Sequence, residues 1–505
     1  MNIPEIKQIE RAGHIEEALN EYKTLLIAFP GDRETRTAMS WCLKLIASEA
    51  SKKKDTERFV QVFEDLASLN LAEIDMVSMA NRFSWEIKTL FDALKNEPTR
   101  LVDVANRLNV ILPCLSFKRP DKYYTLLADA FLKVKGPQGA VWDGFADFMD
   151  WFGFDNLRDE DYERIPLKQA GQSLVSIAER VHSSYFKVLR NRIKNNLAST
   201  EAVERFIDRL TALNNTHPEY QYTLYHKSLL LMALGRKREA LDSVRPFVWR
   251  KQSEFWVWDV LCDCVDDDET KLSCCCRALM SKTEPGFLVR VQLKASQLMH
   301  NLGYDGNAKY ELQSMQKAYA DNGWRVPSEA IELSREEWFV SAEAPESNKR
   351  FYELYLEKSE DLLYSGVPEV AVLATYVNRE KRVFRFATSD RQQGVSSTKK
   401  IRQHISVNRI YLVRIDGNID EKNTKILTCR EATDISPYAD VLFKKIDGVL
   451  HLREGNEYGF VGNIYVDKGL LPDGVSNGTR VSGTAILSFN RKKASWGWKA
   501  LIIKI

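Results

Sequence analysis

The spacing of hydrophobic residues changes once along this chain. Up to about residue 327 they recur at every third or fourth position, as on the buried face of an amphipathic helix. Beyond Pro368 apolar and polar residues alternate, as in strands with one buried face. Between these parts, residues 330–340 and 349–364 keep the helical spacing on either side of a break at 343–348. The sequence therefore predicts a multidomain protein in which a helical part is followed by a β part.

Three segments of the helical part share a turn signature. In each, a glycine is followed five residues later by an alanine, and apolar residues follow one helical turn further on. The pairs are Gly13 and Ala18, Gly235 and Ala240, and Gly303 and Ala308. Glycine permits the backbone conformation of a tight turn, and alanine allows the second helix to approach the first closely. The sequence predicts helical hairpins at these three places.

This spacing resembles the tetratricopeptide repeat, a family whose helical pairs stack into a superhelix. In the first copy, Gly13, Ala18, Tyr22 and Pro30 match the family's turn, small, aromatic and terminating positions. Two later copies, which contain the other glycine–alanine pairs, lack the closing proline. The resemblance implies an α-solenoid over residues 1–342 whose surface holds a protein partner.

The alternating part contains two sets of predicted strands. The first set comprises residues 370–377, 382–388, 407–415 and 424–430. The second set comprises residues 441–446, 449–453, 458–461, 464–466, 480–489 and 496–505. The second set closes on its own within about 70 residues, as a small five-stranded barrel does. We therefore expect two OB-like β-barrels, at 366–432 and 433–505, after a linker and connecting helix at 343–365.

The β part is basic although the whole chain is almost neutral. The formal net charge of the chain is +2, but residues 366–505 hold 23 Lys and Arg against 14 Asp and Glu, a net charge of +9. The remaining 365 residues have a net charge of −7. Nucleic acid is the common polyanionic partner of such a basic surface. A basic β-domain without a polyanionic partner is the alternative.

The second strand set carries glycine-aromatic motifs. Tyr458 and Phe460 flank a glycine, Tyr465 follows in the next strand, and a G-x-x-V-x-G strand opening ends at Gly483. Over residues 434–505 these motifs resemble the cold-shock domain, a family with the OB fold. The resemblance implies that the three aromatic rings face outward and stack on the bases of single-stranded nucleic acid.

The match to the cold-shock pattern is incomplete in the second motif. Where the family has His and Phe, this chain has Asp467 and Lys468, so one or two stacking positions are missing. Trp496 and Trp498, which are two residues apart, either supply replacement rings or belong to the barrel core. Basic side chains that could follow the phosphates are Lys444, Lys445, Arg453, Lys468, Arg491, Lys492 and Lys493.

Residue spacing supports an aromatic platform independently of the resemblance. Tyr458 and Phe460 are two positions apart in a strand, so their side chains project from the same face. Each exposed ring that stacks on a base contributes about 1–3 kcal/mol of binding. The alternative is that these rings belong to the barrel core or contact a protein.

The sequence of the first β-unit gives weaker indications of nucleic-acid binding. Phe384 and Phe386 share a face, and a basic run contains Lys399, Lys400 and Arg402. Such a run is either a solvated face or a phosphate contact.

Two features of the helical part could indicate a functional site, but packing between helices also explains each of them. Five cysteines lie at 262, 264 and 274–276, without the paired spacing of zinc sites, so we expect them to pack between helices. Residues 141–157 interleave aromatic residues with aspartates. Packing between adjacent helices and an exposed docking patch are the two interpretations of that segment.

Motifs of the common enzyme classes are missing from the sequence. It has no P-loop, no dinucleotide-binding glycine motif, no zinc-protease motif and no nucleophile elbow. No signal peptide or membrane span is evident, so we expect a cytoplasmic protein without a membrane partner.

We therefore predict a non-catalytic adaptor without cofactor or metal, which binds single-stranded RNA or DNA through its barrels and a protein through its repeats. Bacterial proteins with this arrangement, some encoded beside conflict or defence systems, are similar to it. The alternative is a protein–protein scaffold whose barrels dock a partner protein.

Overall fold

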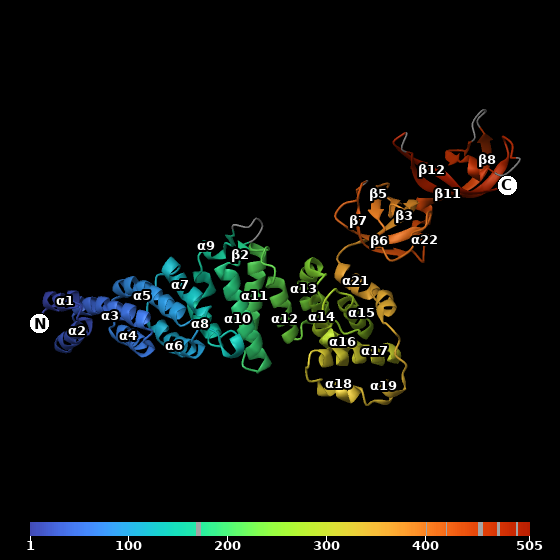
Figure 1. Cartoon of the computed structure of the whole chain (residues 1–505). Coiled ribbons are helices and arrows are strands. Elements are labelled where there is room, and N and C mark those ends of the chain that lie inside the picture. The colour runs from blue at the N-terminus through green and yellow to red at the C-terminus, as the bar shows by residue number, and fades with distance from the viewer. Residues whose placement is uncertain (168–172, 400, 421, 453–457, 472–474, 491–492) are drawn as a thin grey trace. The chain divides into compact units, whose positions relative to one another are not determined.

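A computed structural model describes residues 1–505 with the exception of 168–172, 400, 421, 453–457, 472–474 and 491–492. The chain divides into two compact units, Met1–Phe247 and Val248–Ile505. The described residues of the first unit are mainly helical, with a short ladder between β1 (Ile165–Pro166) and β2 (Ser173–Leu174) and a bridge between Lys135 and Val141. The second begins with helices and ends in β-structure (Figure 1). The predicted order of a helical part followed by a β part is confirmed.

The first unit consists mainly of consecutive helices that pack on their neighbours. They are α1 (Ile3–Arg11), α2 (Ile15–Ala28), α3 (Arg33–Lys53), α4 (Thr56–Ser68), α5 (Glu73–Ala93), α6 (Pro98–Ile111), α7 (Lys122–Phe131), α8 (Phe145–Phe152), α9 (Asp159–Tyr162), α10 (Ile177–Lys194), α11 (Thr200–Thr216), α12 (Thr223–Ala233) and most of α13 (Lys237–Lys251). Several begin after an Asp or Ser whose side chain accepts a backbone N–H three residues on, as Asp32 and Ser176 do.

The glycine–alanine signature marks real helical hairpins. Gly13, Gly235 and Gly303 lie between consecutive helices and have φ of +90°, +75° and +83°, a conformation that favours glycine. The alanines five residues later, Ala18, Ala240 and Ala308, are completely buried in the following helix. The three predicted hairpins are therefore confirmed, and membership of the tetratricopeptide family stays a prediction.

Two helices of the second unit carry the cysteine cluster. The helices that follow α13 in this unit are α14 (Phe255–Asp263), α15 (Asp268–Leu279), α16 (Pro285–Asn301), α17 (Asp305–Asp321), α18 (Ser328–Leu333), α19 (Glu337–Ser341), α20 (Lys349–Leu354) and α21 (Glu357–Tyr364). The cysteines of α14 and α15 and Cys264 after α14 are buried. Among the residues that the structure describes, no three His, Cys, Asp or Glu side chains gather in a way that could hold a metal ion.

The predicted single helix over 349–364 is two helices. The chain turns at residues 355–356 between α20 and α21, which places Leu356 and Leu363 in the interior. Asn348 is buried, and its amide nitrogen donates to Glu311 Oε1 of α17 at 2.6 Å. Ser359 N–H donates to Ser273 Oγ of α15 at 2.8 Å. Both α20 and α21 pack on α15, and the turn between them lets each helix contact it.

The β-structure consists of two five-stranded units joined by α22 (Ser436–Leu442). The first contains β3 (Glu369–Asn378), β4 (Val383–Thr388), β5 (Gln393–Ser397), β6 (Ile410–Asp416) and β7 (Lys425–Glu431). The second contains β8 (Phe443–Leu452), β9 (Gly459–Val461), β10 (Ile464–Val466), β11 (Arg480–Asn490) and β12 (Ser495–Lys504).

Both β-units have the strand order of the OB fold. The second unit is a closed barrel in the order β10-β12-β11-β8-β9, with β10 and β12 parallel. The first unit is a sheet in the corresponding order β5-β4-β3-β6-β7. Its ends approach each other, because Val395 N–H donates to the Asp420 carbonyl at 3.1 Å and Thr424 N–H donates to the Val395 carbonyl at 2.6 Å. The five-stranded Greek-key barrel with this order is the OB fold.

Each β-unit has its own core, and a third cluster joins them. The first core includes Val372, Phe384 and Tyr411, and the second includes Ile446, Leu450 and Val466. The joining cluster contains Ala371, Leu373 and Ile410 of the first unit, Leu442 of α22, and Ile486 and Leu487 of the second. Burial of these apolar side chains holds the two β-units together.

Two details of the predicted strands were wrong. Residues 441–446 and 449–453 were expected to be separate strands, but β8 runs from Phe443 to Leu452 without interruption. It continues through Gly448, because each residue from 443 to 449 pairs with β11. Strand β5 was not predicted, because its sequence Gln-Gly-Val-Ser-Ser has little apolar alternation.

None of the helices that the structure describes is both long enough and apolar enough to cross a membrane.

Candidate nucleic-acid interface

Three aromatic rings gather on the outer face of the second barrel, and we name Tyr458, Phe460 and Tyr465 the aromatic triad. Their ring centroids lie 5.8 Å apart for Tyr458 and Phe460, 5.5 Å for Tyr458 and Tyr465, and 5.8 Å for Phe460 and Tyr465. Phe460 and Tyr465 are direct partners in the β9–β10 ladder. All three are half-buried and lie outside the barrel's apolar core.

The interior of the barrel explains why the triad faces outward. Val461, Ile464 and Val466, which alternate with the triad along β9 and β10, are buried in the core. A Cβ on Gly459 would lie 3.0 Å from the His451 carbonyl oxygen and 3.0 Å from a Leu450 methyl group, so the backbone packs closely there. Gly459 therefore serves close packing of the backbone between the two outward rings.

Charged groups lie beside the triad. Lys499 is the neighbour of Tyr465 in the β10–β12 ladder, and its Nζ lies 3.8 Å from Asp467 Oδ2. The Tyr465 hydroxyl donates to the same carboxylate at 3.4 Å. Burial and the Asp467 charge raise the pKa of Tyr465, so its hydroxyl stays a hydrogen-bond donor at neutral pH. Asp467 is therefore held by a lysine and a phenol, which reduces its repulsion of a phosphate.

Residues 444–503 match the family model of S1/CSD-like domain 2 of the TOTE conflict systems. The match covers β8 to β12 almost completely and includes the whole triad. The C-terminal barrel is thus similar to a cold-shock-like domain that occurs in conflict systems. In OB folds the face of the second and third strands, here β9 and β10, is the one that binds oligonucleotides.

Other parts of the chain have less informative relatives. Residues 221–358 match a domain of unknown function, DUF7017. No curated protein matches the chain. A solved structure described as a circular tandem repeat protein with novel repeat topology and enhanced subunit contact surfaces has 13% identity, with 71% of this chain and 75% of that chain covered. Its TM-score of 0.16 is too low to support a common fold.

The predicted cations of the second barrel are spread over its surface. Lys444 and Lys445 are exposed on β8, and Lys444 Nζ donates to Asn463 Oδ1 at 3.2 Å while lying 5.9 Å from the Trp498 ring centroid. Lys468, after β10, and Lys493, between β11 and β12, are exposed. Arg453, Arg491 and Lys492 lie outside the described residues.

Trp496 and Trp498 do not join the triad. They alternate with Lys499 along β12, so they project from the opposite side of that strand. Trp498 packs against the barrel core and against the cluster that joins the two β-units. Trp496 packs against the joining cluster and lies 5.3 Å from Phe489 between ring centroids. Both tryptophans are half-buried.

The basic run of the first β-unit is partly used within the protein. The Arg402 guanidinium forms an ion pair with Glu360 of α21 and donates to the Glu353 carbonyl at 3.2 Å. Lys399 is exposed, and Lys400 lies outside the described residues. Phe384 and Phe386 are buried in the core of this unit, so their shared face is the interior one.

Sequence analysis missed two neighbours of the triad. His451 is the partner of Phe460 in the β8–β9 ladder and is exposed, and Lys499 stands beside Tyr465. Their positions depend on strand register, which residue spacing within one strand does not specify. The outward position of His451 could have been found from its alternation with the apolar residues of 449–453.

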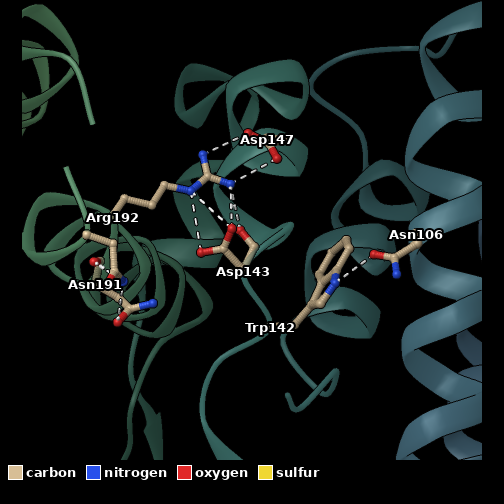
Figure 2. Close-up of polar contacts among 7 residues, drawn as sticks. Asn106, Trp142, Asp143, Asp147, Asn191 and Arg192 are labelled. Carbon is tan, nitrogen blue, oxygen red and sulfur yellow. Dashed lines mark hydrogen bonds and ion pairs between the residues drawn. The ribbon is translucent and has the colours of Figure 1, made fainter. Parts of the chain in front are cut away.

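The aromatic-acidic segment of the first unit is internal packing rather than a docking patch. Figure 2 shows the Arg192 guanidinium between Asp143 and Asp147, at 3.2 Å and 2.8 Å from their carboxylate oxygens. Trp142 is buried, and its Nε1–H donates to Asn106 Oδ1 at 2.9 Å. Most of the segment's other rings are buried too, including Phe145, Phe148, Phe152 and Phe154.

Proposed function

We propose that this protein is a non-catalytic adaptor that binds single-stranded RNA or DNA through the aromatic triad. The observation that carries this proposal is the position of three clustered rings on β9 and β10 of an OB-type barrel. Rings on such a face offer stacking surfaces for unpaired bases without reading their sequence. The net charge of +9 on residues 366–505 supplies attraction to phosphates.

The adaptor role rests on the helical part. Its hairpins, with their glycine turns and buried alanines, are the feature that tetratricopeptide repeats would share. Stacked helical pairs expose an extended surface on which a protein partner can bind. The similarity of the C-terminal barrel to a conflict-system domain supports a place in bacterial defence.

Binding to a labelled single strand tests this function directly. The full-length protein is titrated into a fluorescent mixed-sequence oligonucleotide of about 20 nucleotides, which exceeds the roughly 4–16 nucleotides that one OB fold covers. We expect saturable binding that is lost when the triad residues are replaced together by alanine. A strand-bound preparation would also show raised absorbance at 260 nm relative to 280 nm.

A protein–protein scaffold is the competing function. This function predicts that the wild-type protein binds neither single-stranded RNA nor single-stranded DNA. It also predicts that the variant with all three triad residues replaced by alanine loses binding to a protein partner. The mutual contacts of the three rings, which leave each only half-exposed, are the observation that favours this competitor. Absence of binding to both nucleic acids at low salt would contradict the adaptor proposal.

A further inference from the structure

A cleft lies between the two β-units, beside the apolar cluster that joins them. Its volume is about 190 Å³, and its walls come from β3, β4 and β5 on one side and from β11 and β12 on the other. An apolar cavity of about 150 Å³ accommodates a benzene ring, so this cleft has room for a flat ring. Phe489 and Trp496 form one wall, and Tyr376, with 46% of its surface exposed, stands on the other.

Arg385 brings a positive charge to the same cleft. Its guanidinium carbon lies 5.3 Å from the Tyr376 ring centroid, within the range of a cation–π contact. Within the described part of the chain, no carboxylate forms an ion pair with Arg385. Other arginines of this β-unit do have such partners, as Arg402 has Glu360 and Arg430 has Glu369. The Arg385 charge is therefore available to an anion that enters from solvent.

The cleft is near the aromatic triad along β12, but Trp496 projects from the opposite side of that strand from Lys499. Lys499 stands beside Tyr465, and Trp496 precedes Lys499 by three residues, which corresponds to roughly 10 Å along a strand. Lys444 Nζ donates to Asn463 Oδ1 of the β9–β10 turn and lies over the ring of Trp498, two residues after Trp496. A nucleic-acid strand bound by the triad therefore passes over the barrel edge at the β9–β10 turn, beside Lys444, before it reaches the cleft.

We propose that the cleft is a second base-binding site, in which an unpaired base stacks on Tyr376 or Trp496 and Arg385 binds the neighbouring phosphate. The two β-units then hold one single strand together, rather than acting as independent modules. This inference rests on the proposed function, because the strand is the same one that the triad binds. On the cleft walls, the Ser488 hydroxyl can bond to a base edge, and Thr375 Oγ1, which donates to the Arg385 carbonyl at 3.2 Å, can accept a further hydrogen bond.

Oligonucleotides of two lengths separate the two sites. The full-length protein is titrated into labelled single strands of about 5 and about 20 nucleotides, the shorter being near the minimum site of one OB fold. The cleft variants are Arg385→Gln and Tyr376→Ala. The matched control is Arg480→Gln, which removes the same charge from a side chain that is 78% exposed at the far end of β11 from Phe489.

We expect the cleft variants to weaken binding of the longer strand roughly tenfold and to leave the shorter one almost unchanged. The control should weaken both by no more than roughly twofold, as loss of one exposed charge does. Phe460→Ala should weaken binding of both lengths. If Arg385→Gln has no larger effect than the control while Phe460→Ala acts on both lengths, the cleft proposal is overturned and the triad proposal stands.

The remaining outcomes are also decisive. If the wild-type protein binds neither strand, the proposed function fails and the cleft site fails with it. If Tyr376→Ala lowers the melting temperature, Arg385→Gln decides alone, because Arg385 is a half-exposed side chain that contributes little to the core. Equal affinity of the wild-type protein for both lengths would show that the strand does not extend to the cleft.

Discussion

Phe460 and Val461 are adjacent in β9 and have opposite environments. Phe460 is half-buried among the triad rings on the outer face, and Val461 is 6% exposed in the barrel core. The pair therefore allows a comparison of binding and stability within one strand. A side chain that contributes stacking should affect affinity, whereas its neighbour should affect the free energy of unfolding.

We expect Phe460→Ala to cost about 1–3 kcal/mol of binding free energy to single-stranded nucleic acid, because one stacking surface is lost. Its melting temperature should fall only slightly. Val461→Ala should do the reverse, because it leaves a cavity in the core and does not touch the outer face. Anisotropy titrations beside thermal melts measure both effects. A collapse of the Phe460→Ala melt would mean that the triad supports the fold.

Glu311 is a second single residue whose replacement has a predictable effect, here on the pH dependence of stability. It is completely buried on α17, where it accepts hydrogen bonds from Asn348 at 2.6 Å and from the Tyr352 hydroxyl. Burial raises the pKa of Glu311 to about 7. Because the raised pKa favours the neutral acid in the folded state, its contribution to stability is complete below about pH 4.5 and is lost as the pH rises to about 7.

Glu311→Gln should therefore flatten the pH dependence of stability. The wild-type protein should lose up to about 3 kcal/mol between these pH values through this group, whereas the neutral amide loses none of it. Chemical denaturation at several pH values measures the difference. The control is Glu332→Gln, an exposed carboxylate on α18. Parallel pH profiles for wild type and Glu311→Gln would show that this carboxyl does not titrate in that range.

At the scale of elements, the β11–β12 hairpin belongs to the second barrel and also carries residues of the cluster that joins the two β-units. Gly483 of β11 lies so close to β12 that a Cβ there would be 2.0 Å from the Ile502 carbonyl oxygen. A Cβ added to Gly497 of β12 would have no heavy atom of the described residues within 4 Å, apart from its chain neighbours. One glycine is therefore required by backbone packing, and the other is not.

Gly483→Ala should destabilise the second β-unit by about 1–3 kcal/mol, because the added methyl group must displace the β12 backbone. Gly497→Ala should leave stability unchanged or raise it slightly, since alanine reduces the freedom of the unfolded chain. Urea denaturation followed by hydrogen exchange of the β11 and β12 backbone amides reports on this unit. Equal stability of the two variants would contradict the close approach at Gly483.

Local patterns predicted those elements whose own residues carry the signal. Strand β10 was predicted with its observed limits, and β11 and β12 to within one residue at each end, because their apolar residues alternate. The three glycine turns were found because glycine is favoured at positive φ. The turn at 355–356 and the length of β8 were not, because contacts with distant helices and with β11 determine them.

In the candidate site, too, only the residues that carry a local sequence pattern could be predicted. The triad could be predicted, since its three residues lie in two consecutive strands with a recognisable motif. The neighbours Lys499 and His451 depend on the register of β12 and β8. The cleft with Arg385 and Trp496 depends on how the two β-units pack against each other, so no spacing within the sequence indicates it.

For the molecule as a whole, charge is divided between parts rather than balanced within each. Residues 366–505 have a net charge of +9 and the remaining residues −7. Like charges within the β part repel each other, and part of this repulsion is relieved by ion pairs such as Arg414 with Asp361 of α21. The excess that remains is compatible with a polyanion as the natural counter-charge.

This distribution predicts a strong dependence of binding on salt. Each phosphate that the protein neutralises on a single strand releases bound counterion, with a slope of about −0.7 in log affinity against log salt. With several such contacts, the affinity of the full-length protein for a mixed-sequence strand should fall several-fold between about 50 and 200 mM salt. Base composition should matter little, because an aromatic ring stacks on any base.

Titrations at four salt concentrations give the slope, and Arg480→Gln provides a reference for the loss of one charge. A slope near zero, with binding intact, would mean that stacking alone holds the strand and that the basic charge of the β part has another purpose.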